Sequence, residues 1–396
     1  MVHKFYNGKI IRGNTFAPEG YALYTQDDRI LAITDAQLPF DVGHDVQGKY
    51  ISPGFIDMHI HGGNGYNLRG ENPLEAFIEV SRFHATHGTT VMLPSGSSNT
   101  MQTYIKMFES LDEANRRNAE DSLGAYMPGL HLEGPYFSPA QAGAQEKENM
   151  SPPKPEDYLF LLEKYGDKLI RWSSAPELPG SQEFARALRE HDVVASIGHS
   201  DADFDCVMEA FDWGYTLVTH FYSGCSMVHR KNAYRIAGVV EAAYMLDGMD
   251  VEIIADGKHL PPSLLKLIVK LKGVDRVALI TDAIACAGLP DGSEKNFENP
   301  TFIIEDGVAK LPDRSAFAGS VCTTDRLVRN MIQLADVPLL DAVRMATANP
   351  ARMCNLKDRG HLRPGGFADI VVFDEDIQIA LTMVNGQVVY EKEKQA

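Results

Sequence analysis

The sequence predicts an α/β fold: a (β/α)8 barrel of the TIM type with a small β-sandwich domain formed by both chain termini. Two observations predict it. Eight short apolar runs alternate with helical patterns through the middle of the chain, as a parallel barrel requires. Both ends instead show strands and tight turns, and chain ends often lie close together. A doubly wound open sheet is the alternative, but no glycine-rich phosphate-binding run follows an early strand.

The two ends of the chain are expected to form short strands separated by turns. Residues 5–11 contain an Asn-Gly pair between apolar residues, which predicts a β-hairpin, and residues 26–33 offer another strand. The C-terminal end resembles this, with a strand over 368–374 and a strand, turn and strand over 381–390. The division that follows is 1–52 and 356–396 for the small β domain and 53–355 for the barrel.

The middle of the chain supplies the eight barrel strands. They are predicted at residues 56–61, 89–95, 129–133, 170–176, 193–199, 216–220, 251–256 and 276–282. Helical patterns separate most of them, at 74–87, 101–118, 182–191, 204–213 and 261–271. In the last pattern, Pro261 and Pro262 stand where a helix would begin, and the apolar residues that follow share one face.

The segment after the eighth strand is expected to leave the barrel. A polar insert over 291–299 comes first, and a hairpin-like stretch runs from there to about Leu311. Two amphipathic helices over 323–335 and 340–348 follow, and the Asn349-Pro350 pair is expected to end the second.

Composition narrows the classes of function. The 396-residue chain carries a net charge of -17 and no block of basic residues, which argues against nucleic acid and anionic membranes as partners. No apolar run approaches the roughly 20 residues of a membrane helix. The first residues lack the apolar core of a signal peptide, so a cytoplasmic location is expected. Five scattered cysteines without a C-x-x-C indicate reduced thiols.

Two histidines mark the end of the first predicted strand. His59 and His61 are two residues apart, and side chains at that spacing project from the same side of a strand. Neutral imidazole is a common ligand of metals such as zinc. An isolated pair is equally compatible with two satisfied polar side chains, so the other strand ends decide the matter.

Four further predicted strands end in residues that can bind a metal. Glu133 ends the third strand, His199 the fifth, His220 the sixth and Asp282 the eighth. Each alone has a structural alternative, such as a rim salt bridge, a polar strand end or a helix cap. Six such residues at the face where barrels place their active sites indicate a metal centre. Four histidines and two carboxylates suit zinc or iron better than magnesium or calcium.

A series of short runs carries a resemblance that covers nearly the whole chain in order. The runs are Pro53–Gly62 (Pro-Gly-Phe-Ile-Asp-Met-His-Ile-His-Gly), 131–136 (His-Leu-Glu-Gly-Pro-Tyr), 198–200, 219–220, 255–259 (Ala-Asp-Gly-Lys-His), 281–283, 318–320, 325–330, 349–351 and 365–371. The first resembles the opening motif of the amidohydrolase superfamily. The series as a whole resembles the N-acetylglucosamine-6-phosphate deacetylase family. This resemblance implies a metal-dependent barrel flanked by a β-sandwich.

The resemblance also implies roles for individual residues. Glu133, His199 and His220 match the principal metal ligands. His59 and His61 match the second-metal pair of some members, so one or two ions of zinc or iron are expected. Asp282 matches the catalytic general base and acid. The positions that match substrate-binding residues are Ala144, Gln145, Ser223, Gly224, Arg230, His259, Ala318, Gly319 and Ser320, with Lys231 and Arg235 as alternatives to Arg230.

The activity that the resemblance implies is hydrolysis of the acetamide of an N-acetyl amino sugar 6-phosphate, N-acetylglucosamine 6-phosphate first, in a homodimer. Two departures from the family lie in the substrate pocket: Ser223-Gly224 replaces Asn-Ala, and Gln145 replaces a histidine. Gln can hydrogen-bond but cannot carry charge. N-acetylgalactosamine 6-phosphate or an N-acyl amino acid therefore stays open as the substrate. A catalytically silent scaffold is the remaining alternative, against which the retained ligands and Asp282 weigh.

Overall fold

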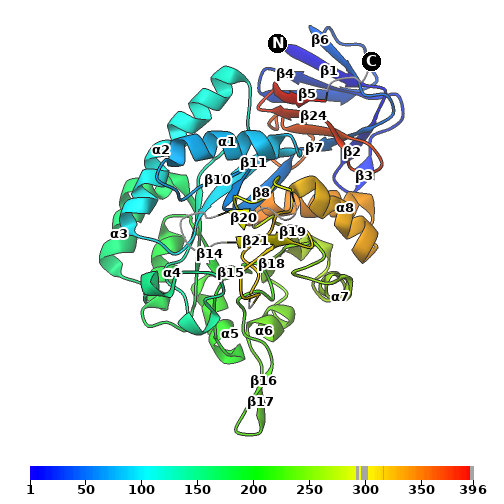
Figure 1. Ribbon diagram of the computed structural model, residues 1–396. Helices are drawn as coiled ribbons and strands as arrows, with labels where there is room; N and C mark the ends of the chain where they lie inside the picture. The colour runs from blue at the N-terminus through cyan, green and yellow to red at the C-terminus, as the bar shows by residue number, and fades with distance from the viewer. Residues whose placement is uncertain (291–293, 296–301, 315, 393–396) are drawn as a thin grey trace.

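A parallel eight-stranded sheet forms the centre of the computed structural model, which describes residues 1–290, 294–295, 302–314 and 316–392 (Figure 1). Its strand order is β19-β18-β15-β14-β13-β12-β11-β8. Every strand overlaps its predicted range, so the barrel is confirmed. The strands are β8 (Phe55–Ile60), β11 (Thr89–Gly96), β12 (Leu130–Glu133), β13 (Leu169–Ser174), β14 (Val194–Ile197), β15 (Tyr215–Val218), β18 (Asp250–Ile253) and β19 (Val277–Leu279).

The first and last strands of this sheet meet just beyond their ends. Ile60 and Ala283 form an isolated parallel bridge, and the Asp282 N–H donates to the His59 carbonyl at 2.9 Å. Asp57 of β8 is fully buried and accepts hydrogen bonds from the backbone N–H and the hydroxyl of Thr281. These contacts close the barrel and bring the ends of β8 and β19 together.

Helices follow the barrel strands in turn and cover the outside of the sheet (Figure 1). They are α1 (Pro73–Ala85), α2 (Met101–Asp121), α3 (Pro155–Tyr165), α4 (Ser181–Glu190), α5 (Phe204–Trp213), α6 (Val239–Met245), α7 (Pro262–Lys272) and α8 (Thr324–Ala335). None of the described helices has the length and apolar character needed to cross a membrane. The sequence pattern does not predict α3 or α6. In α3, exposed Leu159 and Phe160 blur the helical period, and α6 has only seven residues.

The region after β19 departs from its prediction in one respect. The hairpin is confirmed as β21 (Phe302–Glu305) and β22 (Val308–Lys310), with β20 (Glu294–Lys295) paired to β21. The remainder of the polar insert predicted over 291–299 lies outside the described residues. The helix predicted over 340–348 is confirmed as α9 (Leu339–Met345), but its predicted end is wrong, because α9 ends earlier and α10 (Ala348–Met353) begins a new helix. Pro350 lies in the first turn of α10, where a missing N–H breaks no hydrogen bond.

Strands from both chain ends form the predicted β-sandwich. One sheet has the order β5-β4-β1-β6 and the other β25-β24-β23-β7-β2-β3. Figure 1 shows both termini beside these sheets. Phe5 and Leu23 of the first sheet share one buried core with Ile51 and Ile370 of the second. The strands are β1 (Val2–Tyr6), β2 (Lys9–Arg12), β3 (Thr15–Phe16), β4 (Ala22–Gln26), β5 (Arg29–Thr34), β6 (Val42–Asp45), β7 (Tyr50–Pro53), β23 (Ile370–Phe373), β24 (Ile379–Val384) and β25 (Gln387–Glu391).

Two Asn-Gly pairs in the sandwich behave differently. At Asn385-Gly386 both residues have positive φ, and β24 and β25 form the predicted hairpin. The hairpin predicted at residues 5–11 is wrong, because β1 and β2 belong to different sheets. There Asn7 alone has positive φ, and a Cβ on Gly8 would lie 2.3 Å from a Val46 side-chain carbon. That pair makes a tight corner between sheets. The proposed boundaries 1–52, 53–355 and 356–396 stay a prediction.

Candidate metal centre and substrate pocket

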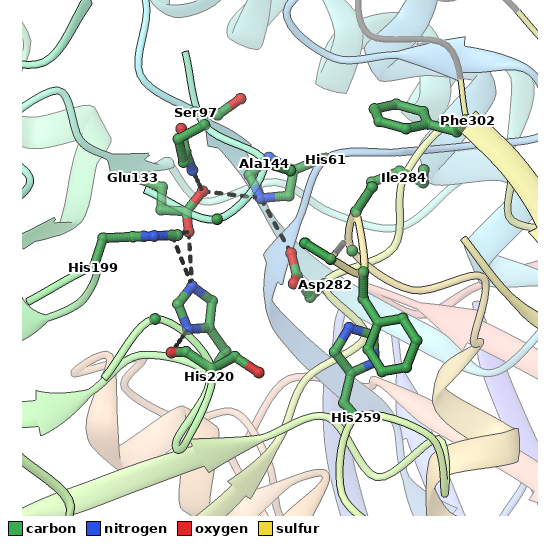
Figure 2. Close-up of a pocket in the computed structure, with 18 of the residues that line it drawn as sticks. His61, Ser97, Glu133, Ala144, His199, His220, His259, Asp282, Ile284 and Phe302 are labelled. Carbon is green, nitrogen blue, oxygen red and sulfur yellow. Dashed lines mark hydrogen bonds and ion pairs between the residues drawn. The ribbon is translucent and has the colours of Figure 1, made fainter. Parts of the chain in front are cut away.

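Five side chains from four separate barrel strands meet at the C-terminal end of the barrel. They are His59, His61, Glu133, His199 and His220, and Figure 2 shows the last four of these. The Nε2 atoms of His199 and His220 lie 3.1 and 2.9 Å from Oε1 of Glu133, and 3.2 Å from each other. On the other side of the carboxylate, the Nε2 atoms of His59 and His61 lie 3.1 Å apart, and that of His61 is 3.3 Å from Oε2 of Glu133. Glu133 thus stands between two pairs of histidines, in the arrangement of one or two shared ion sites.

Each of these histidines turns its other ring nitrogen to an acceptor. A carbonyl or carboxylate can only accept a hydrogen bond, so Nδ1 carries the proton and Nε2 presents its lone pair to the shared space. This is how metal-binding histidines are held. With the hydrogen on Nδ1, the closely spaced Nε2 atoms turn only lone pairs toward one another. A cation between them would be attracted to these lone pairs, so the residues fit a metal ion. The acceptors are the carbonyls of Gln141 for His199 (2.8 Å), Ser223 for His220 (2.9 Å) and Ser95 for His61 (3.1 Å), and the Glu252 carboxylate for His59 (2.8 Å).

The electrostatics of the centre favour positive charge. Burial lowers the pKa of His59, but the carboxylates of Glu252, Asp282 and Glu133 outweigh it and raise that pKa to about 10. Burial also lowers the pKa of His61, but Asp282 and Glu133 outweigh burial and raise that pKa. In return, the surrounding histidines hold the pKa of Glu133 well below its usual range despite its burial. A centre that binds a proton this firmly also attracts a metal cation.

Asp282 lies beside His59 and His61 and lines the pocket, where Figure 2 shows it next to His61. Its Oδ1 atom is 3.3 Å from Nε2 of His61 and 3.6 Å from Nε2 of His59. Burial raises the pKa of this carboxyl, but His59 and His61 outweigh burial and lower the pKa, so the group is ionised. An ionised carboxylate at this place can accept a proton from a molecule in the pocket.

Three of the predicted site residues other than glycine have left-handed backbone conformations. His199, His220 and Asp282 have φ angles of 46°, 27° and 47°, a region that non-glycine residues seldom adopt. Each lies two or three residues past the end of a barrel strand, β14 for His199, β15 for His220 and β19 for Asp282. Backbone strain of this kind costs about 1–3 kcal/mol per residue and is typical of functional sites.

A pocket of about 260 Å³ opens next to the five ligand-type side chains. The predicted substrate-binding residues that line it are Ala144, Gln145, Ser223, Gly224, His259, Ala318 and Gly319. The Gln145 amide donates to Oε2 of Glu133 at 2.6 Å, so it also orients the central carboxylate. Gly224 has a φ of 57°, and a Cβ there would lie 3.0 Å from Nδ1 of His199. A larger residue at this point would press on a ligand.

His259 is held by a neighbouring carboxylate. Its Nδ1 donates to Oδ2 of Asp256 at 2.7 Å, and its backbone N–H donates to Oδ1 at 2.8 Å. Burial raises the pKa of Asp256, but the interaction with His259 outweighs burial and lowers that pKa. The ring of His259 also packs against Phe317 with centroids 4.8 Å apart. This anchoring leaves Nε2 to face the pocket.

Two of the predicted substrate-binding residues lie elsewhere. Arg230 is exposed on β16 (His229–Lys231), which with β17 (Tyr234–Ile236) forms a hairpin that projects from the barrel in Figure 1. Lys231 and Arg235 share that hairpin and that exposure. Ser320 is fully buried, and its hydroxyl donates to the Thr281 carbonyl. It supports the closing strand of the barrel.

The pocket also contains residues that the sequence motifs missed. Asn67, Arg69, Ser97, Ile284, Phe302 and Phe317 all line it. Arg69 is the one lysine or arginine among its described lining residues. It lies in the loop after β10 (Tyr66–Asn67), 3.7 Å from Glu146. Its position directly downstream of His61 was the only available signal.

Comparison with known proteins agrees with this geometry. The Amidohydrolase family model matches residues 50–389. N-acetylglucosamine-6-phosphate deacetylase of Lysinibacillus sphaericus is 32% identical over 86% of this chain and 86% of its own. N-acetylgalactosamine-6-phosphate deacetylase of Escherichia coli O157:H7 is 29% identical over 91% of this chain and 94% of its own.

A solved structure gives the same result for the fold. A mutant N-acetyl-D-glucosamine-6-phosphate deacetylase of Mycobacterium smegmatis, in complex with N-acetyl-D-glucosamine-6-phosphate, superposes with a TM-score of 0.85 at 27% identity. The match covers 98% of this chain and 99% of that one. Because the family model covers most of the chain and the barrel carries the ligand-type residues in place, the chain belongs to the amidohydrolase family, in the branch of the N-acetyl amino sugar phosphate deacetylases.

Proposed function

We propose that this enzyme hydrolyses the acetamide of an N-acetyl amino sugar 6-phosphate, N-acetylglucosamine 6-phosphate first, to acetate and the amino sugar phosphate. The observation that carries the proposal is the meeting of Glu133 and four histidines beside Asp282 at the floor of one pocket. The names of the relatives support the substrate class. The cytoplasm is the expected compartment.

The metal site follows from the ligand geometry. Glu133, His199 and His220 would hold one ion, and His59 and His61 would hold a second one with Glu133. Nitrogen ligands combined with a carboxylate suit zinc or iron. When bound, such an ion supplies a more acidic water and a polarised acetyl carbonyl.

Asp282 would manage the proton of the reaction. The carboxylate takes a proton from the attacking water, whose oxygen forms the new bond to the acetyl carbon. It then gives the proton to the sugar nitrogen as the C–N bond breaks, because an amine cannot leave as an anion. One carboxylate therefore serves as base and then as acid. The lowered pKa of Asp282 supports the first of these roles.

The phosphate requires a basic contact. His259 supplies one from within the chain, and we propose Arg230 of a second copy as the other. The hairpin that carries Arg230 exposes apolar side chains, with Met227 at 47%, Val228 at 54% and Tyr234 at 76% exposure. Such a surface is typical of a protein interface, and it supports a homodimer. Arg69 is the alternative within the same chain.

The identity of the sugar is open to a direct assay. Gln145 and Ser223 replace the residues usual in the family, and the relative that acts on the galactosamine epimer makes that substrate the second candidate. Acetate release should be measured with both 6-phosphates and with both unphosphorylated N-acetyl sugars. We expect kcat/KM to be highest for N-acetylglucosamine 6-phosphate and far lower without phosphate. Hydrolysis of unphosphorylated amides alone would reject the proposal.

A further inference from the structure

An oppositely charged pair lies inside the barrel, directly beneath the metal-type cluster. Arg171 of β13 and Glu252 of β18 are both fully buried and form a two-point ion pair, in which Nη2 lies 2.9 Å from Oε1 and Nη1 contacts Oε2. Barrel interiors are normally filled by branched apolar side chains. A buried ion pair must overcome the loss of hydration of both charges, and an apolar pair is often no less stable. Fold stability alone therefore does not explain it.

The Glu252 carboxylate reaches two residues of the cluster. Its Oε1 accepts a hydrogen bond from Nδ1 of His59 at 2.8 Å and another from the backbone N–H of His220 at 3.1 Å. His59 is fully buried beneath the pocket and has no other hydrogen-bond acceptor for Nδ1 among the described residues. The carboxylate thus determines which ring nitrogen of His59 carries the proton.

Arg171 is fixed by neighbours on other strands. Its Nε donates to the Ser196 hydroxyl at 3.1 Å, and Nη2 donates to the Thr219 hydroxyl at 2.8 Å. These contacts hold the plane of the guanidinium. Two parallel hydrogen bonds from a fixed guanidinium allow a carboxylate only one orientation. Glu252 consequently has little freedom to turn away from His59.

A second buried pair in the same chain offers a contrast. Arg359 and Asp369 are about as buried, at 6% and 5% side-chain exposure, and lie in the sandwich. Their further partner is Asn385, in the turn between β24 and β25. That pair touches no residue of the cluster, whereas the Arg171–Glu252 pair touches two.

We propose that Arg171 and Glu252 are positioning residues for the metal ligand His59: Glu252 holds the hydrogen on Nδ1 so that Nε2 faces the ion, and Arg171 fixes Glu252. The inference rests on the proposed metal-dependent function. The pair would then determine how tightly the site at His59 and His61 binds its ion. The ion at Glu133, His199 and His220 is expected to depend on it less.

The test compares ion binding in Glu252→Gln and wild-type protein. A glutamine puts a donor NH2 where Oε2 accepts from Nη1 of Arg171, so the guanidinium no longer fixes the side chain, and His59 is left with a neutral amide oxygen as its acceptor. His59→Ala identifies the ion that depends on His59. We expect Glu252→Gln to lower the affinity for that ion about 10- to 100-fold, as loss of a group that orients a metal ligand does. Ions per chain are counted by mass spectrometry after dialysis at graded free zinc concentrations.

Two further variants keep the result interpretable. Asp369→Asn breaks the remote buried pair, and it is expected to lower the melting temperature with unchanged ion affinities. Arg171→Met/Glu252→Gln removes both buried charges together and leaves His59 only a neutral amide oxygen that no guanidinium holds in place. This double variant is used if Glu252→Gln alone does not fold. It should show the same selective loss.

Two results would overturn the inference. One is unchanged affinity for both ions when Glu252 is replaced, whether singly or with Arg171. The other is a His59→Ala variant that binds ions as the wild type does, since His59 would then be no ligand. Acetate release by the wild type is measured in the same samples. Its absence would reject the proposed function, while the ion affinities would still report on the positioning.

Discussion

At the scale of single residues, Asp282 has to be ionised while buried beside other carboxylates. His59 and His61 make this possible, because they lower the pKa of the Asp282 carboxyl more than burial raises it. Its left-handed backbone turns the side chain toward His59 and His61, at the neighbouring end of β8. The proposed proton transfer therefore depends on Asp282, whereas binding of the first ion depends on Glu133, His199 and His220.

This separation predicts the outcome of Asp282→Asn. The amide keeps the size of the side chain but cannot take a proton from water. We expect kcat to fall by about 10²- to 10⁴-fold, the usual contribution of a general base. Metal content measured on the same preparation should stay at the wild-type level. A variant that turns over at nearly the wild-type rate would remove Asp282 from this role.

The residue that holds the phosphate is decided by a pair of matched variants. Arg230→Met and Arg69→Met each remove one guanidinium and keep a long apolar side chain. Loss of a charged hydrogen bond of about 1.5–3 kcal/mol predicts a rise in KM of roughly 10- to 100-fold for the phosphorylated sugar. We expect this for Arg230→Met, with little change for the unphosphorylated sugar. A larger effect from Arg69→Met would assign the contact to Arg69.

Sequence spacing identifies most of the centre but not its support. His59 and His61 are evident because two residues on one side of a strand must project together, and the other ligands end predicted strands. Arg171 and Glu252 could only have been noticed as charges inside apolar strands, since their partnership exists only when β13 and β18 face each other across the barrel. Arg69 follows no motif at all. Arg230 fits a motif yet lies outside the pocket of its own chain.

At the scale of elements, strands that are buried are predicted correctly from the sequence, whereas turns and helix ends are predicted less well. Short apolar runs between helical patterns predict all eight barrel strands, because strands such as β8, β11 and β12 are buried on both faces. Local turn chemistry is less decisive. The Asn-Gly pair at 385–386 makes a hairpin, while the pair at 7–8 joins two sheets. Val46 leaves no room for a Cβ at residue 8, and β1 and β2 pack into the sandwich core from different sheets. Pro350 begins a helix where the sequence suggested an end.

Two paired strands of the sandwich contain a pH-sensitive contact. His3 on β1 and His44 on β6 place Nδ1 and Nε2 2.9 Å apart, so one ring must donate and the other accept. Burial, and then the charge of His3, lower the pKa of His44 to about 4, and burial lowers that of His3. Both pKa values lie below the ordinary 6.5. Stability from this contact is therefore complete above pH 6.5 and is lost as the pH falls towards 4.

His44→Gln should make the protein less sensitive to acid in that range. A glutamine can keep a hydrogen bond to His3 and has no proton to gain. Melting temperatures recorded from pH 7 down to pH 4.5 should fall less steeply for the variant than for the wild type. Parallel curves for the two proteins would show that the histidine pair does not contribute.

At the scale of the whole molecule, the barrel carries a hairpin that its own chain leaves uncovered. β16 and β17 project away from the barrel (Figure 1). Tyr234 and Val228, which directly precedes β16, are exposed there, as are the basic residues Arg230, Lys231 and Arg235. Basic residues on a chain with a net charge of -17 favour an acidic surface as their partner. A second copy of the chain offers such a surface, and a dimer would carry Arg230 to another pocket.

The dimer prediction is tested by mass in solution. Light scattering coupled to gel filtration should give twice the 43.7 kDa of one chain. Val228→Ser/Tyr234→Ser removes the exposed apolar contacts and should shift the protein towards the monomer, with a raised KM for the phosphorylated sugar. Exchange of Leu159 and Phe160 on α3 for serine is the matched surface control and should leave the mass unchanged. A wild-type monomer with full activity would reject the shared pocket.

The central claim is that Glu133 and four histidines hold the metal that drives amide hydrolysis at this pocket. The most direct test is to strip the protein of metal with a chelator and restore zinc or iron in small steps. At each step, bound ions per chain and acetate released from N-acetylglucosamine 6-phosphate are measured together. We expect no acetate from the metal-free protein and a recovery that rises in proportion to the ion at Glu133, His199 and His220. Full turnover by the metal-free protein would contradict the account.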